Sequence, residues 1–112
     1  MCLFCKIIQK EIPADIVYEN EEVLAFRDIS PQAPVHVLII PKIHVENVCS
    51  INSDNSHVLV DIHNAANEVA KKMGIYDKGY RLITNCGKDA GQTVMHLHYH
   101  LLGGEKLQEK IV

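Results

Sequence analysis

The sequence predicts a single α+β domain with a mainly antiparallel sheet, and three observations lead to that class. Short β-rich runs follow one another in series, as they do when neighbouring strands pair through hairpins. One long amphipathic segment, residues 53–74, interrupts the series. The chain has 112 residues without a repeat, linker or low-complexity stretch, which suits one domain over residues 1–112 with one core.

The first half of the chain is expected to hold a short helix and three strands. Residues 4–8 suit a short amphipathic turn of helix. The β-rich runs 16–18 and 23–27 are separated by a polar stretch, which predicts a hairpin. Residues 36–40 are almost continuously apolar and stop at Pro41, which predicts a central strand buried on both faces.

The second half is expected to begin with the long helix. Its apolar residues recur at the three-and-four spacing of one buried stripe, from Val58 to Met73. Ser53, Asp54 or Asn55 is expected to cap its start, and Gly74 supplies a left-handed stop.

Two further strands are predicted after the helix. Residues 80–85 form the first of them, and residues 93–102 form a last long strand. A glycine-bearing loop joins the two, and Gly103 and Gly104 end the second.

Composition and charge exclude several classes of partner. The formal net charge is −3, and no basic run or patch suggests binding to nucleic acid. The longest apolar stretch, residues 37–41, is far too short to cross a membrane. The four cysteines come without a secretion signal, so we expect reduced or metal-bound thiols in the cytoplasm.

Three of the seven histidines, His96, His98 and His100, stand at alternate positions. In a β-strand this alternation places all three imidazoles on one face and sends the apolar residues between them into the packed side. From the spacing alone three interpretations stay open: a surface strand with polar histidines, a metal site, or a catalytic site.

The histidines lie in a longer pattern that carries a family resemblance. The run from Gly91 to Leu102, GQTVMHLHYHLL, resembles the signature of the histidine-triad family. Segments FRDISP (26–31), HVLIIP (36–41) and GYR (79–81) extend the resemblance over nearly the whole chain. The closing Gly-Gly is similar to the Hint branch rather than the Fhit branch. The resemblance implies a five-stranded antiparallel sheet with one long and one short N-terminal helix, paired as a homodimer.

The resemblance also implies a catalytic role for each histidine. His98 would attack the α-phosphorus of a nucleotide and form a nucleotidyl-histidine intermediate. A neutral imidazole is a competent nucleophile near neutral pH, so this role needs no extreme tuning. His96 and His100 would orient His98 and bind phosphate oxygens, and His36 would join the proton network.

Two neighbouring positions and a pocket complete the implied active site. Gln92 and Thr93 match positions that contact the phosphate and help the leaving group depart. Asp28 resembles a ribose-binding carboxylate, although from sequence alone it also suits a turn before Ser30. Asn85 matches a residue that contacts phosphate or sugar, with a turn at a strand end as the alternative. The remaining substrate-binding positions are Gly91 at the start of the signature and the apolar Phe4, Ile7, Phe26 and Ile29, which would sandwich a purine base or simply fill the core.

A structural zinc is a further expectation. Cys2 and Cys5 have the spacing of a ligand pair, which alone is only half a site. In related members such a pair joins two histidines that match His44 and His96. A closed Cys₂His₂ set would be structural, and the chemistry itself needs no cofactor. The alternative is two reduced thiols.

The resemblance implies a hydrolase that cleaves purine nucleoside 5′-phosphoramidates or related conjugates of AMP or GMP type. A dinucleoside polyphosphate hydrolase or nucleotidyl transferase would use the same intermediate. A nucleotide-binding regulatory protein is the alternative outside the enzymes, and a zinc module would leave His98 and His100 unexplained. The tail from residue 105 lacks the tryptophan of many Hint-type sequences, which puts the leaving group in doubt.

Overall fold

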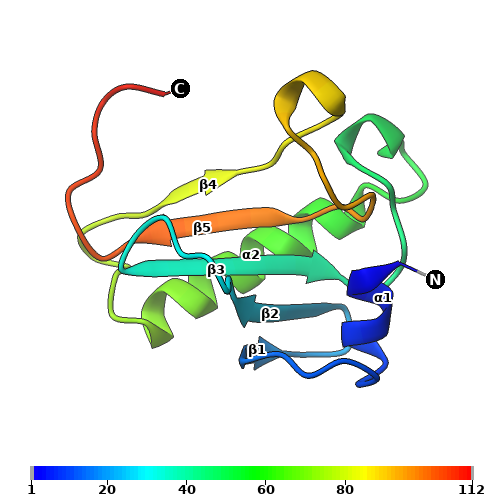
Figure 1. Cartoon of the computed structure of the whole chain (residues 1–112), viewed down its shortest axis with the longest axis horizontal. Helices are drawn as coiled ribbons and strands as arrows, with labels where there is room; N and C mark the ends of the chain where they lie inside the picture. The colour runs from blue at the N-terminus through cyan, green and yellow to red at the C-terminus, as the bar shows by residue number, and fades with distance from the viewer. Residues whose placement is uncertain (1, 112) are drawn as a thin grey trace.

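The computed structural model describes residues 2–111 and shows five strands and two α-helices (Figure 1). In chain order they are α1 (Leu3–Ile8), β1 (Ile16–Glu19), β2 (Val23–Arg27), β3 (Val35–Pro41), α2 (His57–Lys72), β4 (Arg81–Ile83) and β5 (Tyr99–Gly103). The strands form one sheet in the order β1-β2-β3-β5-β4, and every neighbouring pair is antiparallel. The predicted α+β class and five-stranded antiparallel sheet are confirmed. None of the described helices is long and apolar enough to cross a membrane.

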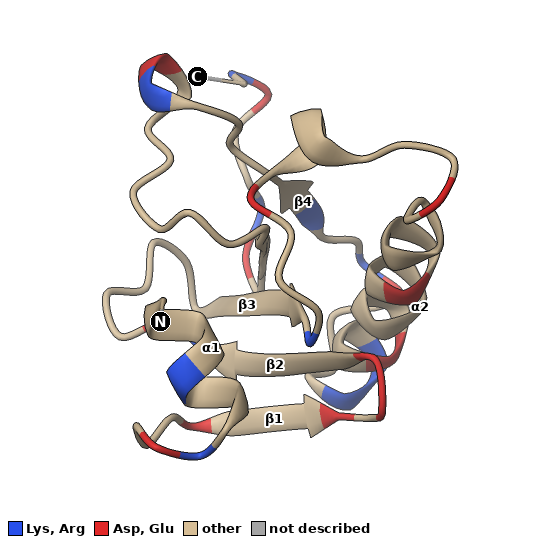
Figure 2. Cartoon of the chain, turned by 90° about the vertical axis from the view of Figure 1, so that its right-hand side faces the viewer, with Lys and Arg blue, Asp and Glu red and all other residues tan. Residues whose placement is uncertain are grey.

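The sheet lies between the two helices, α1 on one face and α2 on the other (Figure 2). Strand β3 shows why, because its side chains alternate between two apolar clusters. Val37 and Ile39 pack in the larger cluster with α2, whereas Leu38 and Ile40 pack in the smaller cluster with Phe4 of α1. The prediction of a central strand buried on both faces is therefore confirmed.

The last predicted strand is wrong in its length. Residues 92–98 follow an irregular path, and the ladder with β3 and β4 begins only at Tyr99. The predicted separation of faces nevertheless holds. Leu97 and Tyr99 belong to the α2 cluster, while the rings of His96 and His98 contact Phe4 on the opposite side.

The ends of the long helix were predicted with mixed success. Its N-cap is Ser56 and not one of residues 53–55, since Asn55 uses its side-chain oxygen to accept from the main chain of Asn52. Gly74 follows the helix with φ +75°, which confirms the left-handed stop. Strand β4 is shorter than the predicted residues 80–85. Two one-turn helices, η1 (Val48–Ser50) and η2 (Lys88–Ala90), were not predicted.

The buried stripe of α2 generates a stability prediction. Ile62 is fully buried against the sheet, so Ile62→Ala should lower the free energy of unfolding by about 2–5 kcal/mol, because it leaves a cavity. Val60 on the same helix is 60% exposed, and Val60→Ala should stay within about 0.5 kcal/mol of wild type. Urea unfolding of both variants measures the difference, and equal losses would contradict the assigned face.

Candidate active site

A cavity of about 650 Å³ opens between α1, the loop after β2 and residues 92–98, which we call the histidine segment. This volume suits a nucleotide-sized molecule. The polar side chains in its lining include His98, His100, Thr93 and Asp28. The apolar wall includes Phe4, Ile7, Phe26 and Leu38. A second cavity of about 630 Å³ near Gly74 has no histidine or cysteine in its lining.

The hydrogen bond of His98 decides which of its nitrogens is free to react. Its Nδ1 lies 2.8 Å from the main-chain oxygen of His96, and a carbonyl only accepts, so Nδ1 carries the proton. The neutral ring therefore keeps its lone pair on Nε2. Among the described residues no buried side-chain nitrogen or oxygen lacks a partner, so Nε2, which has none, is open to the cavity that His98 lines. This arrangement suits a nucleophile.

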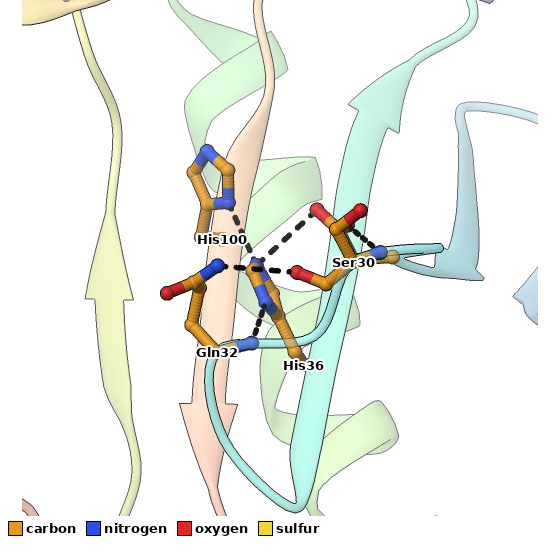
Figure 3. Close-up of polar contacts among 5 residues, drawn as sticks. Ser30, Gln32, His36 and His100 are labelled. Carbon is orange, nitrogen blue, oxygen red and sulfur yellow. Dashed lines mark hydrogen bonds and ion pairs between the residues drawn. The ribbon is translucent and has the colours of Figure 1, made fainter.

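His100 and His36 form a chain of hydrogen bonds with a defined direction (Figure 3). The main-chain N–H of Gln32 donates to Nδ1 of His36 at 3.0 Å, so the proton of this imidazole lies on Nε2. Nε2 then donates to Nδ1 of His100 at 2.9 Å. His100 is left with an N–H at Nε2, the donor that an oxyanion requires.

The carboxylate of Asp28 contacts two partners beside this chain of hydrogen bonds. One carboxylate oxygen accepts from the main-chain N–H of Ser30 at 2.7 Å, which is the turn role that the sequence suggested. The other lies 3.5 Å from Nε2 of His36. Since Asp28 also lines the cavity, its turn contact does not exclude a contact with substrate.

Burial sets the charge state of His36 and His100. Desolvation lowers the pKa of His36, and the nearby Asp28 carboxylate offsets only part of that effect. Desolvation also lowers the pKa of His100, and its histidine neighbours His98 and His36 lower it further. Both imidazoles are therefore neutral at pH 7, as the directed hydrogen bonds require.

A second cluster lies beside the first and includes His96 from the same segment. The thiols of Cys2 and Cys5 and the Nδ1 atoms of His44 and His96 lie within 4.8 Å of one another. Four sulfur–nitrogen distances are 3.3–3.6 Å, and the two nitrogens are 3.1 Å apart. A tetrahedral zinc with such ligands has edges of roughly 3.3–3.8 Å, so the donor set fits this ion.

Protonation also favours a cation in the second cluster. Nε2 of His96 donates to the main-chain oxygen of Pro41 at 2.9 Å, which leaves the lone pair on Nδ1, toward the thiols. Burial and the neighbouring Cys2 raise the pKa of Cys5, so this thiol needs a nearby cation to stay as a thiolate. Asp28, His36 and His100 are also close enough to share an ion. There Nε2 of His36 carries the proton, so that triad suits proton transfer instead.

The remaining predicted residues differ in whether they line the cavity. Thr93, Phe4, Ile7 and Phe26 line the cavity as expected, whereas Ile29 stands at the rim with its side chain almost fully exposed. Four of the predicted contacts, Asn85, Gly91, Gln92 and His96, are absent from the cavity lining. The amide of Gln92 is buried and bonded to neighbouring loops.

Two features of the site were missed. The hydroxyl of Thr84 donates to the main-chain oxygen of His98 at 2.8 Å and so helps fix its backbone. An ion pair between Arg27 and Asp15, 3.0 Å long, lies at the cavity wall. Neither shows a sequence signal, because both contacts depend on how separate segments meet.

Comparison with known proteins shows the family to which the chain belongs. The family model for the HIT domain matches residues 9–107, so the chain belongs to the HIT family, and it is a hydrolase of that family. The match begins after Cys2 and Cys5, which therefore lie outside it.

Individual relatives cover almost the full length of the chain. The purine nucleoside phosphoramidase of Escherichia coli K12 is 49% identical over 105 residues, covering 94% of this chain and 88% of the relative. A HIT family hydrolase from Clostridium thermocellum superposes with a TM-score of 0.97 at 63% identity, covering 99% of this chain and 96% of that one. A histidine triad nucleotide-binding protein from Candida albicans gives a TM-score of 0.80 at 34% identity, covering 100% and 87%.

The lowered pKa of His36 generates a prediction about pH. The unfolded chain takes up a proton at this residue near pH 6.5, the ordinary value, whereas the folded chain does so only at lower pH. The free energy of unfolding should therefore fall as the pH drops below 6.5, and His36→Gln should make that fall shallower. Urea unfolding between about pH 8 and about pH 5.5 measures it, with the exposed His57→Gln as control. A His36→Gln profile parallel to that of wild type would contradict the assignment.

Proposed function

We propose that this enzyme hydrolyses purine nucleoside 5′-phosphoramidates or related nucleotide conjugates at the α-phosphate, through a nucleotidyl intermediate on His98. The observation that carries the proposal is the bond from Nδ1 of His98 to the carbonyl of His96, which leaves Nε2 free toward the cavity that His98 lines. The Escherichia coli relative named for phosphoramidase activity supports the choice of substrate class.

The proposed reaction has two steps at one nitrogen. Nε2 of His98 attacks the α-phosphorus, a nitrogen–phosphorus bond to the imidazole forms, and the bond to the leaving amine breaks. The amine departs with a proton from the hydroxyl of Thr93, which lines the cavity. Water then attacks the same phosphorus and returns a proton to Thr93, and the bond to the imidazole breaks, which releases the nucleoside monophosphate and restores His98.

The neighbours of His98 suit the charge that develops in these steps. The N–H at Nε2 of His100 would donate to a phosphate oxygen. His36 fixes the orientation of the His100 ring, because it donates to Nδ1 on the other side of that ring. Asp28 would accept from the ribose hydroxyls, which favours ribonucleotides. Phe4 and Phe26 meet edge to face, with ring centroids 5.6 Å apart, in the apolar wall where a purine would lie.

Assembly as a homodimer is part of the proposal. Strand β4 is an outer strand of the sheet, with β5 as its partner, so its other edge is available to a second copy. A two-fold pairing through this strand and α2 would join two sheets.

The first test concerns the nucleophile. His98→Ala should lower turnover of adenosine 5′-phosphoramidate on the order of 10⁴-fold, because it removes the covalent route. Mass spectrometry of rapidly quenched wild type should find an adenylyl group on His98, and His57→Ala on the exposed face of α2 should behave as wild type. Turnover preserved in His98→Ala would overturn the mechanism. Faster cleavage of a dinucleoside polyphosphate would favour that substrate class, and AMP binding without turnover of either would favour a regulatory protein.

We also propose that Cys2, Cys5, His44 and His96 hold a structural zinc ion that the reaction itself does not use. Bound thiolates suit a chain kept in the reducing cytoplasm. The ion would fix α1, which carries Phe4, against the histidine segment.

The zinc proposal predicts a metal content. Protein purified without chelator should carry about one zinc ion per chain by elemental analysis. Cys5→Ser should lose the ion and lower the melting temperature, because the ligand set is broken. Cys49→Ser is the matched control, since that exposed thiol is outside the cluster. Metal-free wild type with an unchanged melting temperature would contradict the proposal.

A further inference from the structure

The segment that carries His96 and His98 needs anchors other than a β-ladder. Residues 92–98 are irregular, yet His96 and His98 must be placed accurately for the chemistry. One anchor is the main-chain N–H of Leu97, which donates to the carbonyl of Val45 at 2.6 Å. The other contacts at the start of the segment converge on the side chain of Gln92.

The amide of Gln92 uses every hydrogen-bonding position it has. Nε2 donates to the carbonyls of Glu46 at 2.8 Å and Val94 at 3.1 Å. Oε1 accepts from the main-chain N–H of Gly87 at 2.9 Å and from Nδ2 of Asn47 at 3.1 Å. The partners fix the orientation of the amide, because two of them are carbonyls and two are donors.

These four bonds join three segments. They connect the loop after β3, the turn that begins η2, and the start of the histidine segment. Gln92 is only 6% exposed and is absent from the cavity lining, whereas the next residue, Thr93, lines the cavity. A contact between this amide and a phosphate would break bonds that leave buried groups unpaired, which is costly.

We infer that Gln92 is a positioning residue that places Thr93 and the histidine segment, and not a ligand of the phosphate. Asn47 is its partner in this role. The side-chain oxygen of Asn47 accepts from the main-chain N–H of Cys49 at 3.0 Å, so one residue both caps η1 and holds Gln92. The inference rests on the proposed function, in which Thr93 supplies the proton for the leaving amine.

The test compares two leaving groups in single-turnover reactions. An alkylamine departs only with a proton, whereas an arylamine depends less on one. Gln92→Met keeps the length of the side chain and removes its hydrogen bonds, so Thr93 should shift. We expect the rate with the alkylamine substrate to fall on the order of 10- to 100-fold and the rate with the arylamine substrate to fall less. Dissociation constants for AMP should stay near the wild-type value.

A second variant keeps the test independent of folding. Asn47→Asp retains the oxygen that caps η1 and removes the donor to Gln92, so it should show the same dependence on the leaving group with a smaller loss. Thr93→Val should show that dependence in full, and the double variant with Gln92→Met should be little worse than either single change. Gln9→Met, at the exposed end of α1, should match wild type.

Each other outcome overturns the inference. Weakened AMP binding in Gln92→Met with normal Asn47→Asp would make Gln92 a phosphate ligand. An equal loss for both leaving groups would reduce its role to stability, and wild-type behaviour of Thr93→Val would remove the residue that Gln92 is said to place. An adenylyl group trapped on His98 in these cases would leave the proposed function standing.

Discussion

The hydrogen bond from Nδ1 of His98 to the carbonyl of His96 is the contact on which the active site depends. It joins a side chain to its own backbone two residues earlier, so it is set by the local course of the chain. That course is held by Val45, which accepts from Leu97, and by Thr84, which donates to His98. The fold thus determines which nitrogen faces the cavity.

Main-chain carbonyls select the free nitrogen of each histidine in the segment. The carbonyl of Pro41 accepts a hydrogen bond from Nε2 of His96, which leaves the lone pair of Nδ1 toward the thiols. The carbonyl of His96 accepts a hydrogen bond from Nδ1 of His98 and leaves Nε2 open to the cavity. The main-chain N–H of Gln32 does the reverse for His36, whose Nε2 becomes a donor. Three imidazoles of one chemical type therefore have different roles.

The sequence predicted much of this arrangement, because the spacing of apolar and polar residues indicates which side of a strand is buried. The alternation from His96 to His100 correctly placed the imidazoles and the apolar residues between them on opposite sides, and the apolar run of β3 correctly indicated burial on both sides. It did not predict that the ladder starts only at Tyr99, since the path of residues 92–98 depends on contacts with residues 41–47, far away in the sequence. The motif match implied a phosphate contact for Gln92, and it gave no sign of the four hydrogen bonds that this amide makes within the protein. The helix cap at Ser56 was missed because several neighbouring residues were equally good candidates.

The most direct measurement of the central claim is ¹⁵N nuclear magnetic resonance of the protein labelled at histidine. The account predicts that the ring of His98 is protonated at Nδ1 and unprotonated at Nε2 in the free enzyme. It also predicts coupling between Nε2 and phosphorus in the trapped intermediate. A proton on Nε2 of His98, or phosphorus bonded to another histidine, would contradict it.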